Sequence, residues 1–364
     1  MSRVVWFAGG GTGGHLYPGL AIARALVRLD PSVRPFFVGA ERGIERTVLP
    51  ASGFPYVLLD LHPLYRTRPW ENWRTLRGAM GALRELGRVA RADAPRLIVG
   101  TGGYAAGAAL AYGAMHGIPV VQQAGDSHPG LTARAFRRWT REYYLAFPEA
   151  ASVIGGSSSA FVDAGAPIDP PPTPLPNRAA ARRAWGFPEQ GGTVVFVYGG
   201  SQGSRAINLT VADWVIRGLP EGIHLIWATG KSGYDEFRPL EGPGVRVRDY
   251  LSPISDAYAA TDLAIARAGA MTTAELFAWH IPAILVPLPT SAANHQTENA
   301  RTLHAAGAAI HLPQAELTAQ RLESTIRDLL DAPAMVERLR QGAAARARPA
   351  AADVIARRIL ALLD

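Results

Sequence analysis

The feature that most restricts the fold is an apolar run that ends in a cluster of glycines. Residues 4–8 form the run, residues 9–14 contain five glycines around Thr12, and His15 follows at once. Apolar residues then recur from Leu20 to Val27 at helical spacing. A strand, a glycine turn and a helix in this order are typical of α/β proteins, where backbone N–H groups approach a ligand. The pattern differs from the dinucleotide motif, which requires G-x-G-x-x-G and an acidic residue further on.

His15 is a candidate general base, because an imidazole titrates near neutral pH and stands where this helix begins. The alternative is a tight turn with a solvated histidine beside it.

The same pattern returns in the second half of the chain. Residues 193–198 are strand-like, and Gly199-Gly200-Ser201-Gln202-Gly203-Ser204 follows. This loop offers N–H groups, a helix N-terminus and hydroxyls, which suit a phosphate or diphosphate, although a turn serving packing alone is the alternative. It lacks the lysine of a P-loop, so nucleoside triphosphate hydrolysis is disfavoured.

Short β-branched runs alternate with helical patterns along both halves, which predicts βαβ units and parallel sheets. The expected strands are residues 4–8, 35–38, 56–60, 97–100 and 119–122, then 193–198, 224–229, 245–248, 263–266 and 283–287. Six prolines fall between Pro167 and Pro176 and predict a stiff linker. Residues 351–363 have the pattern of an amphipathic C-terminal helix.

Composition excludes several classes of protein. The chain of 364 residues carries a net charge of +7 and has no cysteine. It therefore has no disulfide and no thiolate metal site, and the basic charge favours an anionic partner. No signal peptide and no membrane-spanning run of apolar residues is expected. Nucleic-acid binding would fit the charge, but no nucleic-acid-binding motif supports it.

Two further loops carry side chains suited to a sugar nucleotide. Residues 267–275 follow an expected strand, and the Glu275 carboxylate could accept both hydroxyls of a ribose; an ordinary glutamate favoured by the helix dipole is the alternative. Gln296 and Asn299 are three residues apart, so both amides can face sugar hydroxyls from one side of a helix, or simply form its polar face.

Motifs of one family occur in order along nearly the whole chain. They are residues 10–21, 102–104, 129–132, 146–148, 199–204, 267–275 and 295–300. In these motifs the chain resembles the MurG family, the bacterial N-acetylglucosaminyltransferases of peptidoglycan synthesis. The resemblance implies an α/β fold of GT-B architecture, with two Rossmann-like parallel-sheet domains facing a cleft and a C-terminal helix packed back on the N-terminal domain.

The resemblance also implies a division of the chain. Residues 1–166, with the C-terminal helix 345–364, would form an acceptor and membrane-facing domain, and residues 167–178 the proline-rich linker. Residues 179–344 would form the UDP-sugar donor domain.

The resemblance assigns site residues by position. His15 and Asp126 fall on the catalytic positions, and Tyr104 and Asp126 on the acceptor side. The donor-binding positions are Thr12, Gly13, Gly14, Ser201, Gln202, Gly203, Leu251, Ala270, Met271, Thr272, Glu275, Gln296 and Asn299. No metal and no cofactor is implied, since the UDP-sugar is a substrate.

The chain departs from the family pattern at several places. Residues 155–159 look inserted, and Thr290 stands where many relatives have histidine. Two further departures concern residues near the expected site. Gln123-Ala124-Gly125-Asp126 replaces His-Glu-Gln-Asn or His-Glu-Ser-Asp, and Asp169 stands where the family has a donor-side arginine.

Residues 64–91 place Trp70, Trp73, Leu76, Met80 and Leu83 at helical spacing among seven arginines. Tryptophan with arginine suits an anionic membrane surface, whereas the apolar stripe is equally typical of domain core. Arg134, Arg137, Arg138 and Arg141 predict a second basic helix.

We therefore expect an inverting transferase that moves N-acetylglucosamine from UDP-GlcNAc to the muramoyl C4 hydroxyl of lipid I, making lipid II, in the cytoplasm at the inner face of the membrane. The alternatives are a UDP-sugar transferase acting on another acceptor, such as a phenolic metabolite, and a non-catalytic nucleotide-sugar-binding protein.

Overall fold

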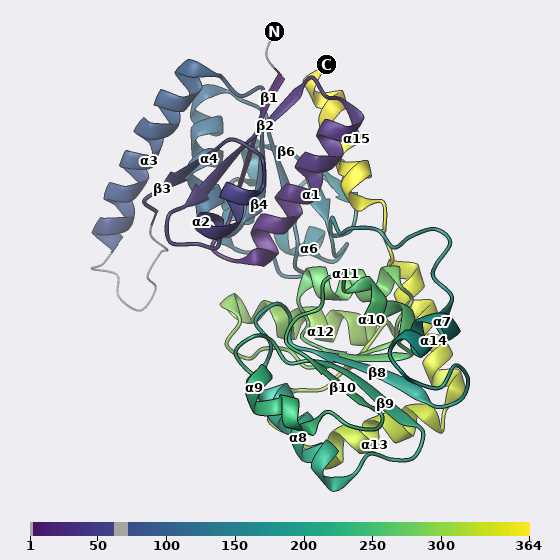
Figure 1. Cartoon of the computed structure of the whole chain (residues 1–364). Coiled ribbons are helices and arrows are strands. Elements are labelled where there is room, and N and C mark those ends of the chain that lie inside the picture. Colours follow the sequence, from purple (N-terminus) through teal and green to yellow (C-terminus); the bar gives the residue numbers. More distant parts are fainter. Residues whose placement is uncertain (1–2, 62–71) are drawn as a thin grey trace. The chain divides into compact units, whose positions relative to one another are not determined.

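The computed structural model describes residues 3–61 and 72–364, and for residues 72–76 it describes the backbone alone. The chain divides into two compact units. Unit 1 comprises Met1–Ile168 and Ala350–Asp364, and unit 2 comprises Asp169–Pro349. Each unit contains one parallel β-sheet with helices on both faces (Figure 1).

The sheet of unit 1 has seven strands in the order β3-β2-β1-β4-β5-β6-β7. Its strands are β1 (Arg3–Gly9), β2 (Val33–Ala40), β3 (Tyr56–Leu59), β4 (Leu97–Gly102), β5 (Val120–Ala124), β6 (Thr140–Leu145) and β7 (Phe161–Asp163). Its helices are α1 (Gly13–Leu29), α2 (Glu45–Val48), α3 (Asn72–Ala92), α4 (Gly103–His116), α5 (Leu131–Ala135), α6 (Ala150–Ile154) and α15 (Ala351–Leu363), with 3₁₀ turns η1 (Leu49–Ala51), η3 (Arg137–Trp139) and η4 (Ser158–Ala160).

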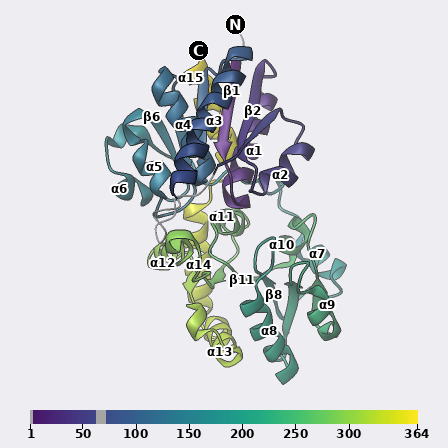
Figure 2. The ribbon, with the colours of Figure 1, turned by 90° about the vertical axis from the view of Figure 1, so that its left-hand side faces the viewer.

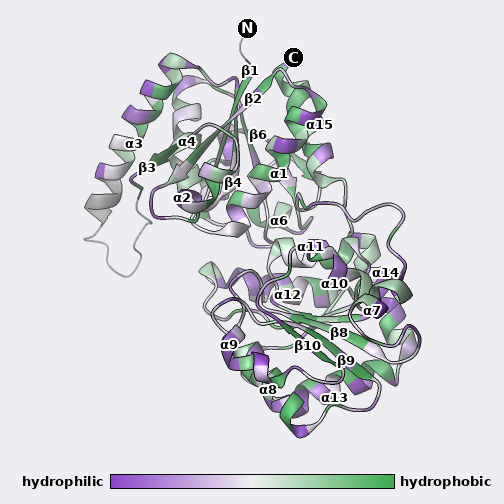
Figure 3. Cartoon of the chain, viewed as in Figure 1, coloured by the Kyte–Doolittle hydropathy of each residue, from purple (hydrophilic) through white to green (hydrophobic). Residues whose placement is uncertain are grey.

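Side-chain alternation along β1 creates two cores. Val5 and Phe7 pack with α1 and α15 on one face of the sheet, whereas Val4 and Trp6 pack with α3 and α4 on the other. A strand buried on both faces reads as a continuous apolar run, which is why residues 4–8 lack polar alternation. Figure 3 shows this concentration of apolar residues along the strands.

The C-terminal helix α15 belongs to unit 1 although it ends the chain, as Figure 2 shows. Ile355 and Ile359 are fully buried in the core that α1 also lines. Arg358 adds a two-pronged ion pair with Glu142 of β6, at 2.6 and 2.8 Å. The expected amphipathic helix over residues 351–363 is thus confirmed.

The sheet of unit 2 has six strands in the order β10-β9-β8-β11-β12-β13. Its strands are β8 (Thr193–Tyr198), β9 (Ile223–Ala228), β10 (Val245–Arg248), β11 (Leu263–Ala266), β12 (Ala283–Leu285) and β13 (Ile310–His311). Its helices are α7 (Arg178–Ala184), α8 (Arg205–Arg217), α9 (Tyr234–Phe237), α10 (Ser255–Ala260), α11 (Ala270–Ala278), α12 (His295–Ala305), α13 (Ala319–Leu330) and α14 (Pro333–Arg346), with 3₁₀ turns η5 (Arg238–Leu240), η6 (Ala292–Asn294) and η7 (Gln314–Glu316).

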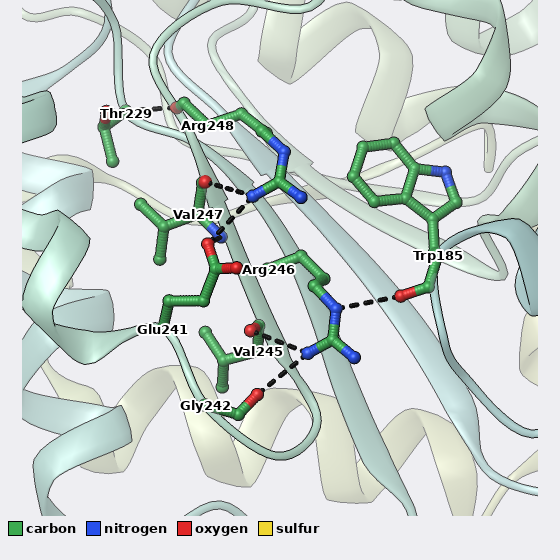
Figure 4. A network of polar contacts seen from close by, with 8 residues as sticks. All are labelled: Trp185, Thr229, Glu241, Gly242, Val245, Arg246, Val247 and Arg248. Atoms are coloured by element: carbon green, nitrogen blue, oxygen red, sulfur yellow. Dashed lines mark hydrogen bonds and ion pairs between the residues drawn. The ribbon is translucent and has the colours of Figure 1, made fainter.

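The first helix of unit 2, α7, is fixed to the sheet edge by arginines of β10 (Figure 4). The Arg246 guanidinium donates to the carbonyl of Trp185, at the C-terminal end of α7, over 2.9 Å, and also to that of Gly242. Arg248 lies over the Trp185 ring and pairs with Glu241 at 2.8 Å. Cations at a helix C-terminus satisfy carbonyls that have no partner within the helix.

Some expectations about the elements need correction. The sequence did not indicate β6, β7 or β13. Strand β6 begins with polar residues, and the other two strands contain only three and two residues. The prediction of a second basic helix is wrong, because α5 ends at Ala135 and Arg141 lies in β6. Residues 140–145 instead form a strand that pairs in parallel with β5, where the Gln122 side chain donates to the Thr140 and Tyr143 hydroxyls.

The tryptophan and arginine stripe is only partly described. Leu83 packs against the core of unit 1, whereas Met80 is exposed. Trp70 and the side chains of Trp73 and Leu76 lie outside the described residues.

Candidate functional site

Each sheet has a point where the strand order reverses, and ligands of α/β proteins bind beyond the carboxyl ends of the strands at such points. In unit 1 the reversal falls between β1 and β4, and in unit 2 between β8 and β11. The two glycine clusters follow β1 and β8 directly. The sheet topology therefore brings the expected motifs to the ligand-binding edge of each sheet.

The loop after β1 is a tight turn that opens into α1. Gly11 has a φ of +87°, which an L-residue with a side chain rarely adopts, and Thr12 is the extended N-cap residue of the helix. Gly13 and Gly14 form the first turn, where backbone N–H groups have no acceptor within the helix. An anionic group can therefore be bound by these N–H groups.

His15 is half-buried at this turn, and its contact with a carbonyl favours one tautomer. Its Nδ1 lies 3.2 Å from the Gly10 carbonyl oxygen and 3.3 Å from the Thr12 hydroxyl. A carbonyl can only accept, so the first contact is a hydrogen bond when Nδ1 carries the proton. The neutral ring then has an unprotonated Nε2, which is the form required of a general base.

The loop after β4 explains why two glycines precede Tyr104. A Cβ at Gly102 would lie 2.7 Å from Cδ2 of His15, and one at Gly103 would lie 2.2 Å from the Gly10 carbonyl oxygen. The Tyr104 ring in turn lies beside Gly11, 3.0 Å from where a Cβ there would be. His15 and Tyr104 are thus brought together from the two loops at the reversal point.

The segment after β5 carries Asp126, which is half-buried. Gln123, at the end of this strand, is 3% exposed, and neither atom of its amide is hydrogen bonded to the described residues. A buried amide without partners is unusual, because it forfeits the hydrogen bonds that water supplied. In the sequence, Gln123 stands out only as a departure from the family pattern.

The loop after β8 is closely packed against its neighbours. A Cβ at Gly199 would lie 2.3 Å from the Ser204 nitrogen, and one at Gly203 only 2.0 Å from the Thr229 carbonyl oxygen. Ser204 caps α8 by accepting from the Ile207 N–H at 3.4 Å. Ser201 and Gln202 are exposed at the tip, where a ligand can reach them.

Arg267 is a buried polar residue whose own role the sequence pattern did not indicate. It is 8% exposed, and its guanidinium donates to Ser204 Oγ at 2.6 Å and to Gln314 Oε1 at 2.7 Å. It also donates to the Val286 and Pro287 carbonyls at 3.0 Å. Burial lowers the pKa of this guanidinium to about 10, so it stays charged at neutral pH. A positive charge thus lies directly beneath the glycine loop.

Glu275 lies in α11, behind a first turn formed by Ala270, Met271 and Thr272. Its Oε2 accepts from the Tyr258 hydroxyl at 2.8 Å, and that hydroxyl is 3.2 Å from the Tyr198 hydroxyl. Burial raises the pKa of Glu275 above its usual value, and the Asp169 charge raises it further. The Tyr258 hydrogen bond acts on this pKa in the opposite direction.

The two amides of α12 differ in their surroundings. Gln296 accepts from the Leu288 N–H at 3.0 Å and is half-buried. Asn299 is fully buried and donates to the Ala268 carbonyl at 3.1 Å, so it supports the loop before α11. Leu251 is half-buried between β10 and α10.

Two features are absent from the described residues, a cluster of metal ligands and a membrane-spanning helix. No group of three or more histidine and carboxylate side chains is arranged to hold a metal ion within residues 3–61 and 72–364. Among the helices of those same stretches, none combines the length and apolar character needed to cross a bilayer.

Comparison with known proteins defines the class. Residues 5–145 match the glycosyltransferase family 28 N-terminal domain, and residues 194–356 match its C-terminal domain. The chain is 38% identical to the UDP-N-acetylglucosamine--N-acetylmuramyl-(pentapeptide) pyrophosphoryl-undecaprenol N-acetylglucosamine transferase of Salinibacter ruber, covering 99% of this chain and 97% of that protein. It is 36% identical to the protein of the same name from Desulforudis audaxviator, covering 97% and 96%.

A solved structure has the same fold. The crystal structure of Acinetobacter baumannii MurG matches with a TM-score of 0.79 at 23% identity, covering 99% of this chain and all of that one. The protein is therefore a glycosyltransferase with two parallel-sheet units of GT-B architecture, and the expected fold class is confirmed. Within that class, the chain belongs to the MurG family.

Proposed function

We propose that this protein transfers N-acetylglucosamine from UDP-N-acetylglucosamine to the muramoyl C4 hydroxyl of undecaprenyl-linked lipid I, forming lipid II. The observation that carries the proposal is the 38% identity, over nearly the full length of both chains, to a relative named for this reaction. The glycine loops that follow β1 and β8 also support the proposal, because both reactants carry a diphosphate, and His15 stands beside the first of these loops.

Unit 2 binds the donor in this proposal. Ser201, Gln202 and Gly203 contact the diphosphate and sugar, and the first turn of α11 contacts the α-phosphate. Glu275 accepts the ribose hydroxyls. Gln296 contacts the sugar, Asn299 supports that side of the site, and the Leu251 backbone contacts uracil. The buried positive charge of Arg267 stabilises the UDP that leaves, since preorganised charge near a developing anion is a large part of catalysis.

Unit 1 activates the acceptor. Nε2 of His15 takes the proton of the acceptor hydroxyl, while the N–H groups of Thr12, Gly13 and Gly14 contact diphosphate oxygens. The hydroxyl oxygen forms its bond to C1 of the sugar on the face opposite the phosphate, and the C1–O bond breaks with its electrons going to UDP. The configuration at C1 is inverted. Tyr104 and Asp126 contact the acceptor, and Asp126 also supports the base.

We further propose that the reaction needs no metal ion, because Arg267 and the helix N-termini supply the positive charge. Full activity in excess EDTA is expected, and activity restored only by Mg²⁺ or Mn²⁺ would contradict this. A lipid-linked acceptor also places the reaction at a membrane surface, and we propose the inner face of the cell membrane, reached from the cytoplasm. The exposed Leu131 and Trp139, among exposed arginines, support contact with anionic lipid.

The decisive experiment is a matrix of donors and acceptors. UDP-N-acetylglucosamine and UDP-glucose would each be tested with a lipid I analogue and with small phenols. Transfer of N-acetylglucosamine to the lipid I analogue alone is expected. Preferential glycosylation of a phenol would instead support the alternative acceptor, and donor binding without transfer would support a non-catalytic protein.

A further inference from the structure

We propose that Glu45 is a positioning residue for His15, acting through the single peptide unit that joins Gly10 to Gly11. The inference rests on the proposed role of His15 as the base. It assigns a function to a buried carboxylate of α2 that the donor and acceptor sites leave unused.

Glu45 is completely buried at the start of α2, whose Val48 packs against the core that α1 lines. Its Oε1 accepts from the Gly11 N–H at 2.9 Å and from the Ala40 N–H at 3.2 Å. It thereby joins the glycine loop to the end of β2. Its Oε2 is buried with no hydrogen-bond partner among the described residues. Burying a carboxylate is costly unless hydrogen bonds replace those of water, and a buried oxygen left without a partner calls for an explanation.

Three glycines make room for this carboxylate. A Cβ at Gly10 would lie 1.5 Å from Oε1, and one at Gly43 would lie 1.9 Å from Oε2. A Cβ at Gly39 would lie 2.9 Å from the Glu45 Cγ. Gly10 is therefore required by the approach of Glu45, which gives part of the glycine cluster a purpose other than phosphate binding.

The same peptide unit contacts His15 on its other side. In a trans peptide the C=O and the N–H point in opposite directions. The Gly11 N–H points to Glu45 and the Gly10 carbonyl accepts from His15 Nδ1 at 3.2 Å. A Cβ at Gly103 would lie 2.2 Å from this carbonyl oxygen, so that side of the peptide is also closely packed. The peptide is thus fixed between a carboxylate and an imidazole.

This arrangement favours the catalytic form of His15. A hydrogen bond to an ionised carboxylate polarises the peptide and strengthens the bond that its carbonyl accepts. The Nδ1–H tautomer is then held, and the Nε2 lone pair can take the acceptor proton. The negative charge also stabilises the imidazolium that forms, as a buried aspartate does when it contacts a catalytic histidine directly.

The test compares E45Q with E41Q, in the wild-type and H15A backgrounds, using UDP-N-acetylglucosamine and a lipid I analogue. The E45Q side chain retains an acceptor oxygen and loses the charge, and Glu41 is an exposed glutamate between β2 and α2. In E45Q, kcat should fall by roughly 10-fold with the donor KM unchanged, and the acid limb of the pH–rate profile should move to lower pH. E41Q should match the wild type.

The H15A background separates positioning from a structural role. If Glu45 acts through His15, then E45Q adds no loss to that of H15A. Equal losses in both backgrounds, or a rise in donor KM alone, would overturn the proposal. If H15A itself retains full kcat, the proposed base fails, which is a distinct outcome.

A second measurement does not depend on the stability of E45Q. The ¹⁵N shifts of His15 in the wild-type protein, assigned by comparison with H15A, should report the Nδ1–H tautomer. A ring protonated only on Nε2 would overturn the proposal.

Discussion

Replacing Gly102 by alanine tests whether the position of His15 determines the rate. Gly102 has φ +103° and ψ −179°, a region that glycine almost alone occupies, so alanine costs about 1–3 kcal/mol in backbone strain. The new Cβ would also lie 2.7 Å from His15 Cδ2. The ring must then move by about 0.7 Å to reach the 3.4 Å at which ordinary contact begins.

G155A is the matched control. Gly155 has φ +67° and ψ 166°, so alanine suffers similar strain there. The atom nearest to its added Cβ is the end of the flexible Arg137 side chain, at 3.0 Å. A comparison of the two variants therefore separates the effect of displacing the histidine ring from the effect of backbone strain at the substituted glycine.

The expected result follows from the sensitivity of catalysis to misplacement, which is about 100-fold for 1 Å. The kcat of G102A should fall by roughly 10- to 100-fold with little change in donor KM. G155A should keep its kcat, while both variants lose similar thermal stability. Transfer would be measured with UDP-N-acetylglucosamine and a lipid I analogue, and unfolding by calorimetry. Equal kcat values in the two variants would refute the assignment of His15.

The remaining predictions concern single groups of the proposed site and surface. H15A should lower kcat by about 100- to 10,000-fold while UDP binding, measured by calorimetry, stays unchanged; weakened UDP binding would place His15 with the donor. Because the pKa of Glu275 is raised, this group stabilises the folded state at low pH, and that contribution is lost as the pH rises. At pH 7.5, E275Q should therefore be at least as stable as the wild type, whereas its KM for the donor should increase. In the wild type, the donor KM should increase as the pH falls through the raised pKa of Glu275. In D169N this increase in KM should occur at lower pH, and an increase at the same pH as in the wild type would exclude coupling to Asp169. R267K should weaken UDP binding by roughly 10-fold, because an ammonium cannot replace a guanidinium that contacts four acceptors; unchanged binding would show that charge alone matters. R138S should reduce binding to anionic vesicles by about 5-fold and leave transfer to a water-soluble lipid I analogue unchanged, and equal binding to neutral vesicles would argue against charge.

Local patterns in the sequence predicted most elements of both sheets. Residues 193–198, 245–248 and 263–266 are strands with the expected bounds. The first and third are apolar or β-branched runs, and the second alternates valine with arginine. The pattern failed where tertiary contacts replace local signals. Glu142 in β6 pairs with Arg358, which follows it by more than 200 residues, and no local sequence pattern indicates that partner.

The sequence by itself determined the fold class, the family and the loops that carry the candidate site, since glycine turns and apolar runs act over short distances. Only the tertiary structure decided why particular glycines stand there. Gly102 makes room for the His15 ring, and Gly10 for the Glu45 carboxylate. Tertiary structure also placed the charge of Arg267 beneath the Ser204 hydroxyl. These relations depend on close approach between segments far apart in the chain, which residue spacing cannot encode.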